Sequence, residues 1–193
     1  SIKVIRHKSF KDASMFKITG GTFKVNATDA TSSITFDGKK IETTVIGGGA
    51  FYVDGGNINF NGADKSGGGK TIAVENNVIS PSSSYADGGG VCINSNGTNT
   101  LSNCSITGNT ASSTSSSASS GGVFLGGSGT NTLENCSITG NTASGSYSSS
   151  GGGVFVSSGT NTLINCSITD NKAESSSYAY GGGVYIFNGT STL

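Results

Sequence analysis

The feature of this chain that most constrains its fold is a twelve-residue segment that occurs three times. The copies read TNTLSNCSITGN at 98–109, TNTLENCSITGN at 130–141 and TNTLINCSITDN at 160–171. Polar and apolar residues alternate within each copy, and a period of two is typical of a β-strand rather than a helix. Because the copies begin 32 and 30 residues apart, the chain repeats one structural unit at a period typical of solenoid proteins.

A second motif places a glycine pair or triplet before another alternating strand, as in GGGVCI at 88–93 and GGGVFV at 151–156. The copies are aligned on the first apolar residue of each strand, namely Phe23, Phe51, Val91, Val123, Val154 and Val184. In the first copy Phe36 and Gly38 are aligned with Leu101 and Asn103. Exchange of Gly for Asn indicates a left-handed turn at that position.

Three short strands per ~30 residues, with no segment of helical period, predict a coil that cannot bury its apolar side alone. Stacked coils bury it continuously, strand on strand at ~4.8 Å. The sequence therefore predicts an all-β fold, a parallel β-solenoid of about six coils with roughly 30 residues each. Equivalent residues should stack into Leu, Ile, Cys and Asn ladders, and Asn ladders can hydrogen-bond from coil to coil.

The solenoid is expected to span residues 20–193 and to continue beyond 193 in a longer parent chain. Residues 1–19 are expected to form an N-terminal cap or an incomplete coil. Serine-rich segments such as ASSTSSSASS at 111–120 separate the repeats. Their polar, low-complexity composition predicts variable loops that project into solvent at one corner of the coil.

The charge balance excludes one class of partner. The chain has 11 basic and 11 acidic residues and a single arginine, Arg6. Nucleic acids are gripped by clustered positive charge, so we expect no nucleic-acid partner.

The outward positions of the glycine-motif strands are the candidate binding site. They are Lys24, Tyr52, Cys92, Phe124, Phe155 and Tyr185. If the coils stack in register, the four aromatic residues line one face, and contiguous exposed aromatic surface suits sugars and protein partners. Two alternatives are that the serine-rich segments fold over these rings, or that the rings only stiffen the solenoid.

The cysteines are interpreted as free thiols. Cys104, Cys136 and Cys166 occupy equivalent inward positions, where cysteine acts as a small apolar residue. Cys92 is predicted to point outward and to be the one reactive thiol. The wide spacing of the four does not resemble a zinc motif, and we expect no metal and no cofactor.

The paired GGGV-type and ITGN-type motifs resemble the GGA[ILV] and FxxN repeats of bacterial polymorphic outer membrane proteins. More broadly, the chain resembles the right-handed β-helix passengers of autotransporters and other surface adhesins. Ile106 to Asn109, Ile138 to Asn141 and Ile168 to Asn171 match the second motif, with Ile in place of Phe. The resemblance covers about residues 20–193 and implies a right-handed parallel β-helix that is secreted and displayed on a bacterial surface. It implies no catalytic residues.

Some right-handed β-helices cleave acidic polysaccharides, and that chemistry needs convergent carboxylates, Ca²⁺ ligands or a basic side chain on neighbouring coils. No acids stack in the sequence alignment, for Glu134 aligns with Ser102 and Ile164. We therefore expect no enzymatic activity and no catalytic residues.

The sequence favours a secreted adhesin or stalk segment on the bacterial cell surface, whose loops and aromatic face contact a host-cell receptor, a cell-surface receptor or a glycan. The alternative is a structural subunit that self-associates through its solenoid ends into extracellular filaments, because open ends are unpaired sheet edges. A third hypothesis is an ice- or glycan-binding solenoid, since the TNT segments align in T-x-T columns that resemble those of some antifreeze proteins.

Overall fold

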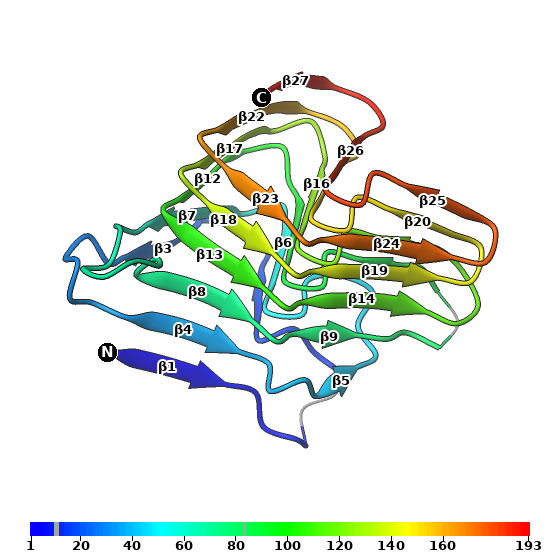
Figure 1. The fold of residues 1–193 in the computed structure, drawn as a ribbon, viewed down its shortest axis with the longest axis horizontal. Coiled ribbons are helices and arrows are strands. Elements are labelled where there is room, and N and C mark those ends of the chain that lie inside the picture. The colour runs from blue at the N-terminus through cyan, green and yellow to red at the C-terminus, as the bar shows by residue number, and fades with distance from the viewer. Residues whose placement is uncertain (10–11, 83) are drawn as a thin grey trace.

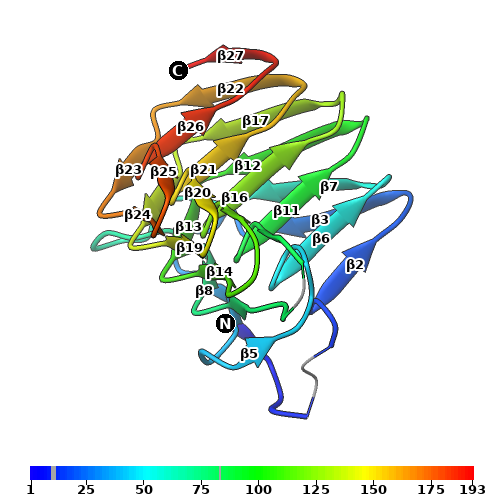
Figure 2. The same cartoon turned by 90° about the vertical axis from the view of Figure 1, so that its right-hand side faces the viewer.

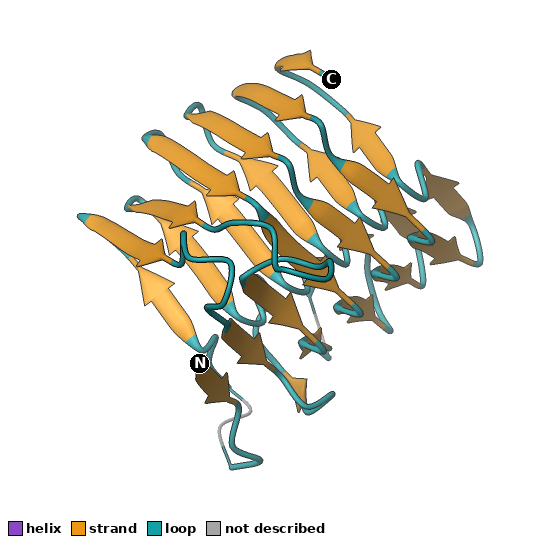
Figure 3. Cartoon of the chain, turned by 60° about the vertical axis from the view of Figure 1, so that its left-hand side comes forward, coloured by secondary structure: helices purple, strands orange, loops and turns teal. Residues whose placement is uncertain are grey.

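The protein is a solenoid of parallel strands, seen in a computed structural model that describes residues 1–9, 12–82 and 84–193. Among the described residues every regular element is a strand. Successive coils stack on one another from the N-terminal to the C-terminal end of the chain (Figures 1 and 3). The coils number about six, with about 32 residues each. The all-β parallel solenoid predicted from the repeats is thereby confirmed.

Three sheets of six strands enclose the main core. Sheet A contains β1 (Ile2–Ile5), β4 (Ile34–Asp37), β8 (Ile72–Glu75), β13 (Cys104–Thr107), β18 (Ser137–Thr139) and β23 (Ser167–Thr169). Sheet B contains β2 (Phe16–Ile18), β6 (Phe51–Asp54), β11 (Val91–Asn94), β16 (Val123–Gly126), β21 (Val154–Val156) and β26 (Val184–Ile186). Sheet C contains β3 (Thr22–Asn26), β7 (Asn57–Asn61), β12 (Thr98–Ser102), β17 (Thr130–Glu134), β22 (Thr160–Ile164) and β27 (Thr190–Thr192).

Two further sheets project from this body on the right of Figure 1. Sheet D contains β5 (Glu42–Thr43), β9 (Val78–Ile79), β14 (Thr110–Ser113), β19 (Thr142–Gly145) and β24 (Lys172–Ser175). Sheet E contains β10 (Ala86–Asp87), β15 (Ala118–Ser119), β20 (Ser148–Ser150) and β25 (Tyr178–Tyr180). Figure 2 faces these two sheets.

The prediction that the serine-rich segments are loops, and that each coil has three strands, was wrong. These segments form strands of sheets D and E. They pack around a small apolar core of their own, formed by Ile79, Ala86, Ala111, Ala118 and Ala143. Small side chains at alternate positions let two strands approach closely, and the buried serines satisfy their hydroxyls on backbone groups. Ser149, for example, accepts from the Gly145 amide at 2.7 Å and donates to the Glu174 carbonyl at 2.5 Å.

The alignment of the first coil was also wrong. Phe23 pairs with Ile58 in sheet C, and the sheet-B partner of Phe51 is Phe16. The reason is that glycine also precedes the sheet-C strands, so that Gly21-Thr22 corresponds to Gly97-Thr98. The outward residue of the first sheet-B strand is therefore Lys17, which pairs with Tyr52, and not Lys24.

Phe36 likewise stacks on Val74 in sheet A, and Val74 stacks on Ile106, so Phe36 is not equivalent to Leu101. The left-handed turn expected at Asn103 is nevertheless present, with φ of 52° there and at Asn135. Asparagine tolerates this conformation better than most residues with a Cβ.

Two asparagine ladders run along the core, as the repeats predicted, and all their members except the partly buried Asn171 are buried. Asn77, Asn109, Asn141 and Asn171 form one, with side-chain amides 2.9–3.0 Å apart from coil to coil. Asn99, Asn131 and Asn161 form the other, at 3.0 and 2.9 Å. Each ladder fixes the register of successive coils, because a shift in register would leave buried amide groups without hydrogen-bond partners.

The glycine triplets that follow strands of sheet E connect each of these strands to the next strand of sheet B. On the way they pass close to the backbone of sheet D. Gly151 is left-handed, with φ of 57°, and a Cβ on Gly152 would lie 2.4 Å from backbone atoms of Lys172 and Gly182. The middle glycine is thus required by backbone contact with neighbouring segments, and the first by its conformation.

We expect Gly152→Ala to lower the free energy of unfolding by about 3 kcal/mol, because backbone atoms must move to admit the methyl group. Chemical denaturation followed by circular dichroism measures this. Gly20→Ala is the matched control, since a Cβ there meets no atom within 4 Å. Equal stabilities for the two variants would contradict the role assigned to the triplet.

Candidate binding groove on sheet B

The outward side chains of sheet B form a single column along the solenoid. Each residue of the column lies on the strand that pairs with the strand of the residue before it. The order is Lys17, Tyr52, Cys92, Phe124, Phe155 and Tyr185. The structure thus brings together the four aromatic residues that the sequence singled out. Each aromatic side chain of the column is partly exposed.

The C-terminal half of the column is a continuous ladder of rings. Phe124 and Phe155 have ring centroids 5.5 Å apart, and Phe155 stacks on Tyr185 at 5.5 Å. Tyr180 of sheet E stacks on Tyr185 at 5.3 Å. The ladder therefore turns the corner from sheet B onto sheet E.

Sheet E forms the second wall of a groove whose floor is the aromatic column. A hollow of about 410 Å³ lies between Phe155 and Tyr185 on one side and Ser148, Ser150 and Tyr180 on the other. The serine-rich segments therefore flank the rings and leave them accessible. Aromatic faces beside hydroxyl and amide groups are the usual composition of a small-molecule or sugar site.

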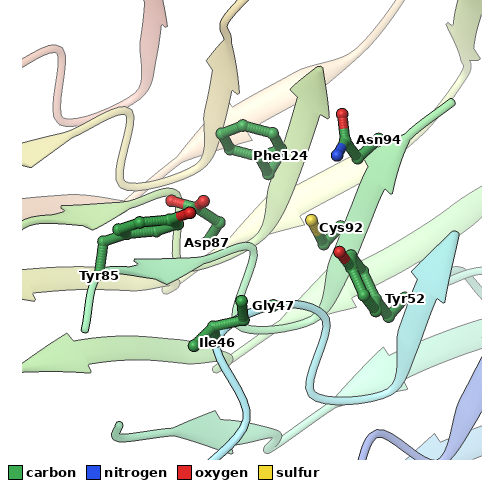
Figure 4. Close-up of a pocket in the computed structure, with 8 residues that line it drawn as sticks. All are labelled: Ile46, Gly47, Tyr52, Tyr85, Asp87, Cys92, Asn94 and Phe124. Atoms are coloured by element: carbon green, nitrogen blue, oxygen red, sulfur yellow. The ribbon is translucent and has the colours of Figure 1, made fainter. Parts of the chain in front are cut away.

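A second hollow of about 220 Å³ lies at the N-terminal end of the same groove. Figure 4 shows Cys92 between Tyr52 and Phe124, with Asp87 and Tyr85 facing them and Asn94 beside Cys92 on β11. Tyr85 and Asp87 are contributed by the segment that enters sheet E, which sequence reasoning had interpreted as a loop. Their participation in the site was therefore missed.

Cys92 is not the exposed thiol that the sequence predicted. Only 3% of its surface is accessible, because the segment at Ile46–Gly47 covers it, and a Cβ on Gly47 would lie 3.1 Å from the Cys92 Sγ. Burial raises the pKa of the Cys92 thiol well above its ordinary value, and Asp87 and Asp54 raise it further. The neutral thiol is unreactive in this form.

Asp87 is the one Asp or Glu among the described residues that line this hollow. Burial raises the pKa of its carboxyl to about 7, although a hydrogen bond from Ser119 opposes the shift. At neutral and mildly acidic pH a large fraction of Asp87 is therefore protonated and can donate a hydrogen bond. Burial also raises the pKa of Tyr52, with a further contribution from Asp54, while a hydrogen bond from Asn94 lowers it.

The model of the right handed beta helix region matches residues 9–193. The chain belongs to the right-handed β-helix family. This family includes both enzymes and structural proteins. No curated protein and no solved structure matches the chain significantly. Within the described part of the β-helix, no helix is long and apolar enough to cross a membrane.

The β-helix does stack one pair of acids, contrary to the sequence expectation. Asp37 and Glu75 are register partners in sheet A. Lys3 and Lys39 each lie 3.0 Å from the Asp37 Oδ2. Burial raises the pKa of Asp37, but the Lys39 amide and the two lysines lower it more, to about 2. Both oxygens of Asp37 are occupied, and the cluster is a structural ion pair rather than a proton donor.

The remaining cysteines follow the sequence prediction. All four cysteines of the β-helix are free, and Cys104 and Cys136 are buried in the main core, with Cys166 packed against it. The thiol of Cys136 donates to the Leu101 carbonyl at 3.2 Å. Among the described residues no cluster of three or more His, Cys, Asp or Glu side chains could hold a metal ion.

The threonine columns of sheet C are also in register. Thr98, Thr130, Thr160 and Thr190 form one column, and Thr100, Thr132, Thr162 and Thr192 the other. Between them Asn99, Asn131 and Asn161 point into the core. Threonine is a favourable outward residue of any strand, so the register of these columns is accounted for by the repeat alone.

Proposed function

We propose that this β-helix is an extracellular adhesin that binds carbohydrate in the groove between sheets B and E. The observation that carries the proposal is the partly exposed ring ladder from Phe124 through Phe155 to Tyr185, flanked by hydroxyl groups of sheet E. Sugar rings present C–H faces that stack on aromatic side chains, and hydroxyl edges that need polar partners. The groove offers both along its length.

The resemblance to polymorphic outer membrane proteins and autotransporter passengers supports display on a bacterial cell surface. The partners would then be glycans or glycosylated receptors of host or neighbouring cells. The fold suits such display because its stacked coils form a stiff rod that holds the groove in a fixed shape. Among the described residues, the one acid pair that stacks between coils is held in an ion cluster on sheet A, which supports a binding rather than a hydrolytic role.

The test is binding of the purified protein to a glycan array and to host cells, beside a variant with Phe124→Ser, Phe155→Ser and Tyr185→Ser. We expect the triple variant to lose at least tenfold in affinity, because each ring contributes stacking to the bound sugar. Tyr147→Ser is the matched control, for Tyr147 is exposed and lies outside the groove. Circular dichroism confirms that each variant keeps its fold.

Equal binding by the triple variant and the parent would place the contact surface elsewhere and contradict the proposal. Absence of carbohydrate and cell binding by every form would favour a scaffold, or a subunit of filaments that grow through the solenoid ends. Sedimentation at increasing protein concentration would detect such growth.

A further inference from the structure

The hollow between Tyr52 and Phe124 is a gap of one ring in the part of the column that runs from Tyr52 to Tyr185, where every other member is aromatic. Tyr52, Cys92 and Phe124 occupy successive coils at the same outward position. Neighbouring strands lie about 4.8 Å apart, so the strands of Tyr52 and Phe124 are separated by about 10 Å. Cys92 is the one small side chain between them, and it is buried at the base of the hollow.

The spacing of the existing ladder shows what this gap can accept. Rings on adjacent strands of the same column sit 5.5 Å apart, at both Phe124–Phe155 and Phe155–Tyr185. A ring inserted above Cys92 would lie about 5 Å from Tyr52 on one side and from Phe124 on the other, which is the separation of favourable ring pairs. The gap is therefore a slot with two aromatic walls.

Three side chains at the edges of the slot are polar, and the segment at Ile46–Gly47 completes the lining beside Cys92. Asp87 and Tyr85 face it from the sheet-E side, and Asn94 lies on the other side (Figure 4). A purely apolar ring would desolvate these groups without giving them partners, at a cost in free energy for each. A ring with apolar faces and a hydroxylated edge avoids that cost.

The charges around the slot select against an acidic guest. Among the described residues, Asp87 is the only carboxylic acid in its lining, and no lysine or arginine of that part of the chain lines it. The ammonium of Lys17 lies over the Tyr52 ring at 5.4 Å and pairs with Asp54 at 3.6 Å, so it is already occupied. Above pH 7, where Asp87 is largely ionised, a carboxylate in the slot would face a second negative charge without a cation in the lining to balance it.

We propose that the slot between Tyr52 and Phe124 binds one neutral pyranose residue, stacked between the two rings with its hydroxyl groups on Asp87, Asn94 and Tyr85. This inference rests on the proposed carbohydrate-binding function and names a specific subsite within it. The slot holds a terminal or branching sugar, and the ladder from Phe124 to Tyr185 extends the contact along the groove.

The experiment titrates the protein at pH 8, where Asp87 is largely ionised, with methyl glycosides of glucose, mannose and galactose and with methyl glucuronide as the anionic comparison. Binding is followed through the backbone amide signals by NMR. We expect at least one neutral glycoside to shift the Cys92 and Asn94 signals saturably, and the glucuronide to bind at least tenfold more weakly. Tyr147→Ala, outside the groove, should bind as the parent does.

Cys92→Phe fills the slot with its own ring and should reduce this binding at least tenfold. Because Gly47 lies close to the Cys92 sulfur, the larger side chain could disturb the fold, and Tyr52→Ala supplies a second variant that removes one wall instead. Tyr52→Ala is expected to lose binding to the same extent. Its circular dichroism spectrum should equal that of the parent protein, which would show that the fold is intact.

Three results would overturn the slot. One is the absence of a saturable shift at Cys92 and Asn94 with any neutral glycoside. Another is binding by Cys92→Phe and Tyr52→Ala that equals that of the parent protein. The last is preferential binding of phenylalanine amide over every sugar. Failure of the slot is distinct from failure of the proposed function. In the first case an array glycan binds the parent and Cys92→Phe equally, whereas in the second no array glycan binds at all.

Discussion

Replacing Asn141 by alanine is expected to lower the free energy of unfolding by about 4 kcal/mol, since a buried hydrogen-bonding group costs roughly 1–3 kcal/mol when left unsatisfied. The side chain is fully buried. Its Oδ1 accepts from the backbone and side-chain amides of Asn109 at 2.9 and 3.0 Å. Its Nδ2 donates to the Ile106 carbonyl and to Asn171 Oδ1, both at 2.9 Å. Alanine removes all four bonds and leaves their partners on Asn109, Ile106 and Asn171 without that side chain.

Asn135→Gly is the control for this measurement. Asn135 adopts φ of 52°, a conformation that glycine adopts readily, so the substitution should change stability by less than about 1 kcal/mol. Urea denaturation of the two variants beside the parent gives both values. If Asn141→Ala were as stable as Asn135→Gly, the ladder would not hold the coils in register.

Asp87 is expected to make the protein less stable as the pH rises from 4 to 7. The folded pKa is about 7, above the ordinary value near 3.9 in an unfolded chain. Between these values the unfolded chain releases a proton that the folded chain keeps, so unfolding becomes more favourable with each pH unit. The total loss is at most about 4 kcal/mol, and it is complete above pH 7.

Asp87→Asn should abolish this slope and leave the variant more stable than the parent at pH 8. Ser119→Ala gives a complementary result. Because Ser119 lowers the pKa of Asp87, its removal should extend the slope to higher pH. Asp37 does not interfere, since its lowered pKa of about 2 affects stability only in more acidic solution. Parallel pH profiles for the parent and Asp87→Asn would contradict the assignment.

The repeats predicted the solenoid because identical segments can only stack on identical segments. The three TNTL copies fix the pairing of Thr98 with Thr130 and of Thr130 with Thr160, and the structure has that register. The aromatic column followed from the same alignment. The first coil was misaligned because glycine precedes strands of both sheet B and sheet C, although Gly21-Thr22 already matched Gly97-Thr98.

Composition alone misled the interpretation of the serine-rich segments. Serine has low strand propensity, yet Ala111, Ser113 and Ala118 alternate with outward residues at a strand period, and the segments pair coil to coil like the rest. With sheet E unrecognised, the second wall of the groove could not be predicted. The cover over Cys92 was equally hidden, because it depends on the Gly47–Asp87 bridge between distant segments.

The measurement that tests the groove most directly is NMR mapping of the strongest neutral oligosaccharide found on the glycan array. We predict that its saturable shifts are confined to the outward residues of sheet B and the adjoining residues of sheet E, with Phe124, Phe155 and Tyr185 the most affected side chains. Shifts centred on the threonine columns of sheet C, or on the solenoid ends, would contradict the account.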